Sequence, residues 1–346
     1  MRYCKPGTLL SLVALLAASL PVPAQGPPPG ENHSILAPLA PQSLLLDGAA
    51  AGGLMAVVGE RGHVLLADEG GESWHQMRVP TTATLTGVYF SDREHGWAVG
   101  HDAVILRTAD GGETWERVHF APEEERPLLD VWFSDERHGY AVGAYSYFLE
   151  TSDGGLTWQD RILEASAWPV PEPAAGGADD ELEYDPAEDI DVHYNAIASA
   201  SAGRLYMAAE AGQIFRSDDG GRTWWSMPSP YEGSFFGVLP LGGDSVLVFG
   251  LRGHLYRSDD GGVSWEAVET STQAMLTDGL KLDDGTIVLT GLAGTLLVSR
   301  DGARSFELVQ FPNREGIAAA LPGDAGKLWL IGESGLDEFT LPGGDR

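Results

Sequence analysis

The sequence has a single cysteine and few cations. Cys4 lies upstream of an apolar run at residues 8–20, the wrong side for a lipid-modified N-terminus. The rest of the chain has no thiol, so its stability must come from a hydrophobic core. Lysine and arginine number 21 against 51 acidic residues, a formal net charge of -30. Nucleic acids and anionic lipid surfaces repel such a chain, and we expect neither as a partner.

Long hydrophobic runs are also scarce. The run at residues 8–20 follows Arg2 and Lys5, ends before the small residues VPA, and is shorter than the roughly 20 residues of a transmembrane helix. This pattern predicts a cleaved signal peptide at 1–24 and a flexible leader at 25–33. Removal of Arg2 and Lys5 leaves 19 basic against 51 acidic residues, or -32. We therefore expect a periplasmic or secreted protein with no transmembrane segment in the mature chain.

One octet recurs throughout the chain. Four strong copies and two weaker ones read TADGGETW (108–115), TSDGGLTW (151–158), SDDGGRTW (217–224), SDDGGVSW (258–265), ADEGGESW (67–74) and SRDGARSF (299–306). Their closing aromatic residues are separated by 41, 43, 66, 41 and 41 residues. A fixed period near 41 indicates a repeat architecture.

Each repeat unit reads as four short strands. The second unit contains TLTGVYFSD, GWAVGHD, AVILRTADGG and ETWERVHF, segments rich in β-branched and aromatic residues that end in glycine, aspartate or serine. Six complete units and a seventh, 316–341, that lacks its fourth strand predict an all-β fold. We predict a seven-bladed β-propeller of four-stranded antiparallel blades over residues 34–341. We expect the N-terminal stretch 34–39 to supply the missing strand and close the ring, so that both termini meet in one blade.

The 66-residue gap contains an insertion. Composition places it at about 166–193, where many carboxylates have no balancing cation, and we expect an acidic loop. Five of its residues could form a lid or a partner contact, or belong to a disordered spacer: Trp168, Tyr184, His193, Tyr194 and Asn195. The segment 188–193 superficially resembles a metal cluster, but its spacing matches no standard site. We predict no metal and no cofactor.

The octet reads as a turn between the third and fourth strands. Its acidic residue can accept hydrogen bonds from backbone amides, its glycines permit positive φ, and its aromatic residue fills space between blades. It lacks the alternating carboxylates of a calcium loop and the Gly-Lys-Ser/Thr of a phosphate loop. Since it recurs in every complete unit, we interpret it as structural, with these principal residues: Asp110, Trp115, Asp153, Trp158, Asp219, Trp224, Asp260, Trp265 and Asp301.

The octets resemble the Asp-box (BNR) repeat, S-x-D-x-G-x-T-W, which occurs in sialidases, sortilin-type receptors, some glucanases and the photosystem II stability/assembly factor family. The GWAVG-type second strands and the SD-x-x-HG links at 91–96 and 134–139 make the unit most similar to the last family. The resemblance covers roughly residues 34–341 and implies a scaffold role in assembling a protein complex. Glu69, Ala303 and Phe306 depart from the pattern, which predicts less tightly fixed terminal blades.

Strand order divides the turns between two faces. First-to-second and third-to-fourth turns share one face, and second-to-third turns and blade crossings share the other, so the octets lie opposite the insertion. His95 and His138 repeat with the octets and are interpreted as structural. The second-to-third turns vary, and variation within a repeat frame is where a propeller encodes binding. We predict a partner-binding set of Glu60, Arg61, His101, Asp102, Tyr145, Glu210, Arg252 and Glu333, with Tyr194 from the insertion.

Catalysis has weak support in the sequence. A sialidase needs three arginines, and these turns offer two. Asp102 paired with Glu60, Glu210 or Glu333 leaves a glycoside hydrolase open. No nucleophile elbow or dinucleotide motif is present. We predict a non-enzymatic, monomeric propeller that binds a protein partner and assists assembly or stability of an envelope complex. The alternatives are an Asp-box carbohydrate-active enzyme and a non-catalytic glycan- or peptide-binding module.

Overall fold

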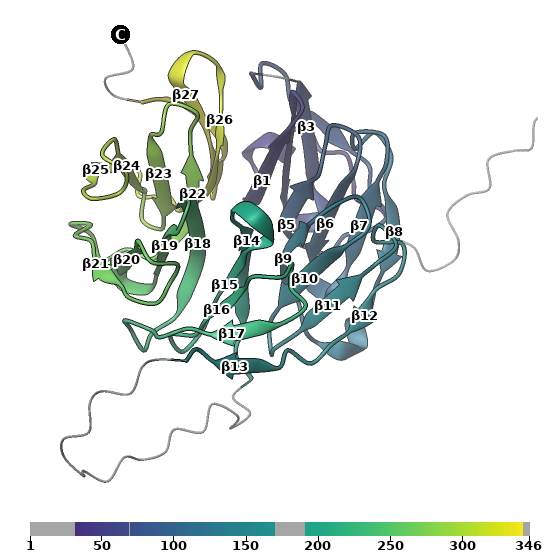
Figure 1. The fold of residues 1–346 in the computed structure, drawn as a ribbon. Coiled ribbons are helices and arrows are strands. Elements are labelled where there is room, and N and C mark those ends of the chain that lie inside the picture. Colours follow the sequence, from purple (N-terminus) through teal and green to yellow (C-terminus); the bar gives the residue numbers. More distant parts are fainter. Residues whose placement is uncertain (1–31, 69, 170–190, 342–346) are drawn as a thin grey trace, which may run out of the picture. The chain divides into compact units, whose positions relative to one another are not determined.

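The computed structural model describes residues 32–68, 70–169 and 191–341 (Figure 1). All of these residues belong to one compact unit. The predicted signal peptide and nearly all of the leader lie outside the described residues, as do Glu69 and the middle of the insertion with Tyr184. Within the described ranges, no helix has both the length and the apolar character to span a membrane.

The described residues form seven sheets, which we number as blades one to seven in chain order. In each blade the strands are given from the inner to the outer one. Blades one to three are β1 (Leu45–Ala51), β2 (Leu54–Gly59), β3 (Val64–Asp68), β4 (His75–Met77); β5 (Leu85–Phe90), β6 (Gly96–Gly100), β7 (Ile105–Thr108), β8 (Glu116–His119); and β9 (Leu128–Phe133), β10 (Gly139–Gly143), β11 (Phe148–Thr151), β12 (Gln159–Asp160).

Blade four is β14 (Tyr194–Ser199), β15 (Leu205–Ala209), β16 (Ile214–Ser217), β17 (Trp224–Ser226), with β13 (Ala165–Ala167) outside β17. Blades five to seven are β18 (Phe235–Gly242), β19 (Ser245–Gly250), β20 (Leu255–Ser258), β21 (Glu266–Ala267); β22 (Leu276–Lys281), β23 (Ile287–Gly291), β24 (Thr295–Ser299), β25 (Glu307–Gln310); and β26 (Ile317–Pro322), β27 (Lys327–Gly332), β28 (Gly335–Thr340).

The seven sheets close into a ring and confirm the predicted seven-bladed β-propeller. Each inner strand packs against the inner strand of the next blade, and β26 packs against β1. In Figure 1, β1, β14 and β22 accordingly lie inward of β8, β12, β21 and β25. Second strands such as β6 and β10 are buried along their whole length because a neighbouring blade covers each face. The core is therefore divided into seven hydrophobic clusters, each between two adjacent blades.

A glycine at the end of most second strands permits a close backbone approach. A Cβ on Gly100 would lie 2.1 Å from the carbonyl oxygen of Thr84, just before the inner strand, and the next residue, His101, donates its N–H to that oxygen at 2.9 Å. All seven blades repeat this bond. On the other side, Gly111 of an octet donates to Glu94 of a first-to-second turn. These contacts confirm the predicted division of the turns between two faces.

The seventh blade has three strands, β26, β27 and β28, and the expectation that residues 34–39 complete it is wrong. The N–H of Ser34 donates to Val79 and the Gln76 amide donates to Ile35, which hold this segment against the first blade without strand pairing. The two ends of the described part of the chain, near residues 34 and 341, therefore lie in adjacent blades. Apolar side chains of the first and seventh blades, such as Leu321, close the ring.

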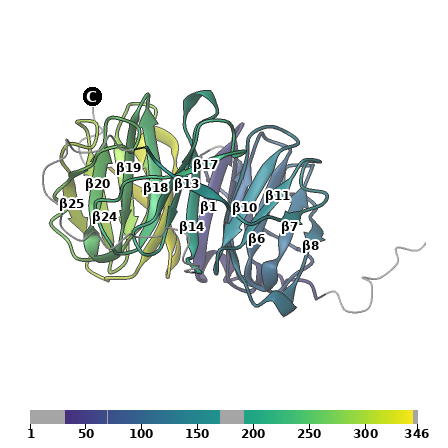
Figure 2. The same cartoon turned by 60° about the horizontal axis from the view of Figure 1, so that its bottom comes forward.

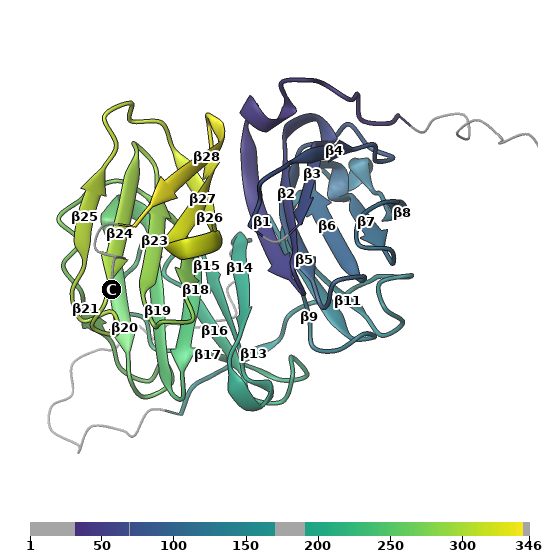
Figure 3. The ribbon, with the colours of Figure 1, turned by 90° about the horizontal axis from the view of Figure 1, so that it is seen from above.

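The fourth blade has the opposite irregularity, because it gains a fifth strand. β13 pairs in parallel with β17, and Trp168 continues the ladder by donating its N–H to Ser226 at 2.9 Å (Figures 2 and 3). The Trp168 ring contacts Trp225 edge-on, and the Arg216 guanidinium lies 4.8 Å from its centre. The insertion expected as a loop thus begins as an outer strand, which positions Trp168 at the blade edge.

Candidate partner-binding face

We call the seven second-to-third turns the turn face: residues 60–63, 101–104, 144–147, 210–213, 251–254, 292–294 and 333–334. The first six contain two consecutive residues with positive φ, as in hairpin turns of type I′. The first of each pair is never glycine: Arg61, Asp102, Tyr145, Ala211, Arg252 and Ala293, with φ from 53° to 60°. Such conformations cost on the order of 1 kcal/mol or more for a residue other than glycine. Because the turn recurs in six blades, this conformation belongs to the repeat frame.

Tyr145 and Glu210, predicted separately from two blades, are brought together by His193. The His193 imidazole lies edge-on to Tyr145, with ring centroids 4.8 Å apart. Its Nδ1 is 3.6 Å from a Glu210 carboxylate oxygen, and its backbone N–H donates to the other oxygen at 3.2 Å. The end of the insertion is thereby fixed on the turn face between the third and fourth blades.

Three of the remaining charged residues of the predicted set, Glu60, Arg61 and Glu333, have a polar contact within the first or the seventh blade. Arg61 lies 3.8 Å from the Glu60 carboxylate, and Glu333 accepts the N–H of Gly316 at 2.9 Å. His101 and Asp102 are exposed, as is Arg252.

Tyr194 is placed differently from the rest of the predicted set. It is 5% exposed, within the core between the third and fourth blades, because it is the first residue of an inner strand. Its side chain is therefore not part of the turn face.

Two exposed leucines were not selected from the sequence. Leu251 and Leu292 are 36% and 40% exposed, in the turns of the fifth and sixth blades. The equivalent position, directly after the second strand, holds Glu60, His101, Ala144, Glu210 and Glu333 in the other blades. The sequence signal that could have identified these leucines is a large apolar residue at a repeat position that faces solvent. With Tyr145, 50% exposed, these leucines give the turn face apolar contact points among its charges.

Three aspartates on inner strands form a second feature that sequence reasoning missed. Asp47, Asp130 and Asp278 occupy one repeat position, each after a bulge in its strand. Asp47 accepts the N–H of Val88 at 2.7 Å and Asp130 that of Ile197 at 2.8 Å, so both join neighbouring blades. Their side chains keep some solvent contact, but protein surrounds the carboxylates. This burial, and repulsion from Asp278, raise the pKa of Asp130 to about 7.

The octets on the opposite face stabilise the ionised form of their carboxylates by hydrogen bonds. Asp219 accepts the backbone N–H of Thr223 at 2.9 Å, the Thr223 hydroxyl at 2.7 Å and the Ser217 hydroxyl at 2.9 Å. Four other octets repeat these three bonds. Hydrogen bonds from Thr157 lower the pKa of Asp153 to about 2. No group of three metal-binding side chains occurs in the part of the chain that the structure describes.

Known proteins resemble this chain in family and fold. The family model described as "Photosynthesis system II assembly factor YCF48" matches residues 66–128 and 119–294. The photosystem II assembly protein Ycf48 of Thermosynechococcus vestitus is 51% identical over 43 residues, which are 12% of this chain and span 12% of that protein.

Two solved structures share the fold at low sequence identity. The structure titled "YCF48 bound to D1 peptide" has a TM-score of 0.64 and 17% identity, covering 87% of this chain and 94% of that one. A streptogramin B lyase has a TM-score of 0.67 and 13% identity, covering 86% and 93%. Since a lyase and a peptide-bound protein are about equally similar, the fold alone does not decide between catalysis and binding.

Proposed function

The chain belongs to the family of the photosystem II assembly factor YCF48, and from that premise we propose that it is a non-enzymatic propeller that binds a protein partner through its turn face. The family's members are assembly factors by name, which supports a role in assembling or stabilising a protein complex. We place this complex in the cell envelope, because the N-terminal sequence has the pattern of a secretory signal.

One observation carries the proposal: neighbouring blades expose Leu251 and Leu292 on the turn face, with Arg252 beside the first leucine. A leucine side chain that goes from full exposure to full burial stabilises by roughly 1.5–3 kcal/mol. Leu251 and Leu292 are 36% and 40% exposed, so covering them contributes a fraction of that value each. Arginine and tyrosine are enriched at the centres of protein interfaces, and the same face offers Arg252 and Tyr145. A partner protein whose surface has apolar patches between charged residues would complement these leucines and the arginine beside them.

The experiment compares exposed leucines on the two faces. Leu251→Asp combined with Leu292→Asp places charge on the turn face, and the control Leu156→Asp changes a leucine that is 51% exposed in an octet. Tagged proteins are cross-linked in envelope extracts of the source organism, and the recovered proteins are quantified. We expect the turn-face variant to recover the partner roughly tenfold less than wild type, and the control to match wild type. Equal recovery by all three proteins would refute a partner on the turn face.

A glycan screen tests the non-enzymatic part of the proposal. A glycosidase mechanism on this face would pair Asp102 with Glu60, Glu210 or Glu333, and the screen replaces Asp102 and Glu210. We expect no glycan turnover that depends on them. Turnover by the wild type that Asp102→Asn or Glu210→Gln abolishes would replace binding by catalysis as the function.

A further inference from the structure

The seventh blade presents an unusually long open edge. Its outer strand β28 has six residues, whereas β4, β8, β12, β17, β21 and β25 have two to four. In the other blades a fourth strand covers the third; here the third strand is itself the edge. Natural sheets usually shorten or cover their edges because an open edge pairs readily with another strand. Residues Ala40–Gln42 contact β28 beside Gly335, at the start of the strand. The rest of β28 is therefore an available pairing site.

The free backbone groups of β28 can be assigned. Gly332 pairs with Gly335 across a two-residue turn, and the N–H of Leu341 donates to Gly326 beyond the end of the strand. Hydrogen-bonded and non-hydrogen-bonded pairs alternate along an antiparallel ladder. Residues 335, 337 and 339 consequently bond to β27. The N–H and C=O groups of Leu336, Glu338 and Thr340 point toward the open edge.

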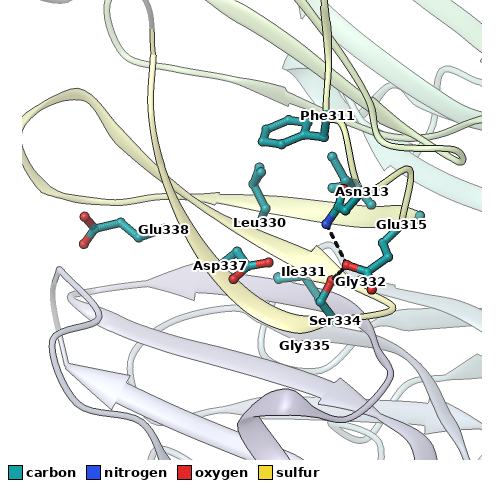
Figure 4. A pocket seen from close by; sticks show the side chains of 12 residues that line it. Phe311, Asn313, Glu315, Leu330, Ile331, Gly332, Ser334, Gly335, Asp337 and Glu338 are labelled. Atoms are coloured by element: carbon teal, nitrogen blue, oxygen red, sulfur yellow. Dashed lines mark hydrogen bonds between the residues drawn. The ribbon is translucent and has the colours of Figure 1, made fainter.

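A pocket of about 240 Å³ lies beside this edge (Figure 4). Phe311, Ile317 and Leu330 contribute apolar surface, and Glu315, Asp337 and Glu338 contribute carboxylates. None of its twelve lining residues is a cation.

Two of the three carboxylates have partners. Glu338 pairs with Lys327 at 2.7 Å, and Glu315 accepts hydrogen bonds from Asn313 and Ser334. In Figure 4, the Asp337 side chain lies between Glu338 and Ser334. Leu330 and Asp337 are cross-strand partners, so their side chains lie on one face of the sheet, and residues of an added strand share a face at every second position. The pocket thus suits an apolar side chain with a cation two residues before or after it.

The fourth blade demonstrates strand addition in this same chain. β13 lies on the outer edge of β17, and the Trp168 side chain fixes it by contact with Trp225 and Arg216. An outer edge of this propeller therefore accepts a further strand when an apolar side chain anchors it. The edge of β28, with its adjacent apolar pocket, offers the same two elements.

We propose that the open edge of β28 binds an extended peptide of a partner protein in which a basic residue lies two positions from an apolar residue, so that both side chains face Leu330 and Asp337. The peptide backbone pairs with the outward groups of Leu336, Glu338 and Thr340, as in β-strand addition to other domains. An apolar side chain enters the pocket against Phe311 and Leu330, and a lysine or arginine meets Asp337. The site lies at the blade edge, so this inference does not rest on the proposed function of the turn face.

The test uses the full chain and the capped heptapeptide Thr-Lys-Thr-Val-Thr-Lys-Thr, in which lysine and valine lie two positions apart and so share a face of the added strand. A second peptide with glutamate in place of lysine is the charge control. We expect the lysine peptide to slow amide hydrogen exchange at Leu336, Glu338 and Thr340 by about tenfold or more, and the glutamate peptide to bind roughly tenfold more weakly. Equal binding of the two peptides, or protection away from β28, would overturn the proposal.

Two variants at one position isolate the backbone pairing. Thr340→Pro removes an outward N–H and leaves the bonds to β27, whereas Thr340→Ala keeps that N–H. We expect Thr340→Pro to lose most peptide affinity and Thr340→Ala to retain it. If Thr340→Pro does not fold, Asp337→Lys is the second variant, and it should invert the preference between the two peptides. Unchanged binding in the folded Thr340→Pro, or unchanged preference in Asp337→Lys, would refute the site.

Two further measurements identify what occupies the edge. Sedimentation of the chain alone tests whether a second copy pairs with β28: a dimer that Thr340→Pro abolishes would replace the peptide as the occupant. The variant with Leu251→Asp and Leu292→Asp should bind the lysine peptide as wild type does. Partner recovery therefore tests the turn-face proposal, and binding of the lysine peptide tests the β28 site independently of it.

Discussion

The two faces of the propeller repeat by different means. On the octet face the side chains repeat: five octets make the same three bonds around an aspartate, as at Asp219. On the turn face the backbone repeats: seven turns donate an N–H to the start of the inner strand, whatever their side chains are. The fold therefore requires the side chains of the octets, whereas the side chains of the turns are free to vary. This difference makes the turn face the better candidate for binding.

The carboxylates of the two regions differ in the same sense. Octet aspartates are ionised anchors, since hydrogen bonds lower the pKa of Asp153 to about 2. The inner-strand aspartates are enclosed by protein, and burial raises the pKa of Asp130 to about 7. One set stabilises as an anion and the other as a neutral acid, so acid and alkali should weaken the propeller at different places.

The largest effect that tests this comparison is expected from an octet tryptophan. Trp224 is 2% exposed between the third and fourth blades, and its indole N–H donates to Gly221 at 2.9 Å. Trp224→Ala should lower the free energy of unfolding by about 3–5 kcal/mol in urea denaturation, because it leaves a cavity and an unpaired carbonyl. The control Tyr145→Ala removes a half-exposed ring from the turn face and should cost well under that. Similar losses in both variants would contradict the division of labour between the faces.

The next effect is a pH dependence that separates the two sets of carboxylates. The Asp130 pKa is about 7 in the fold against an ordinary value of 3.8, so the folded state binds more protons between these values. Its stabilising contribution is complete below about pH 3.8 and is lost as pH rises through about 7, with a slope of at most about 1.4 kcal/mol per pH unit.

Asp130→Asn should flatten the pH dependence of the free energy of unfolding between about pH 5 and pH 8. Asp153→Asn is the matched control from an octet. Because the Asp153 pKa is lowered to about 2, its contribution is lost only as pH falls toward that value, and the slope above pH 5 should stay unchanged. Urea denaturation at both pH values measures the slopes. An equal slope in wild type and Asp130→Asn would show that this carboxylate is ionised in the fold.

Locality explains which parts of the fold the sequence could predict. The octet bonds join residues two to four positions apart, such as Thr108, Asp110 and Thr114, so the motif carries its own structure. Ring closure involves contacts such as that of Trp329 with Gly70, 259 residues apart, and nothing local distinguished it from a shared strand. Likewise, β13 pairs with a strand about 60 residues ahead.

The same argument applies to the candidate site. Alternation of antiparallel strands was sufficient to place the turns on one face and to find Tyr145 and Glu210 there. It did not find Asp130, because its hydrogen-bond partner Ile197 is 67 residues away in the next blade. Leu251 could have been found from its place in the repeat, because polar residues such as Glu60 and His101 hold the equivalent position in other blades; its 36% exposure in the fold confirms that it is not a core leucine.

The smallest expected effect separates the repeated backbone of the turn face from its variable side chains. Arg61 has φ 56° and ψ 26°, a conformation that glycine adopts without steric cost and alanine does not. Arg61→Gly should therefore exceed Arg61→Ala in free energy of unfolding by about 0.5–1 kcal/mol, as measured in urea. Both variants lack the guanidinium, so partner recovery should fall equally in the two. If partner recovery instead varies with the free energy of unfolding, the Arg61 side chain has a structural role. If partner recovery falls equally in the two variants while their free energies of unfolding differ, the backbone of the turn and the binding surface are independent.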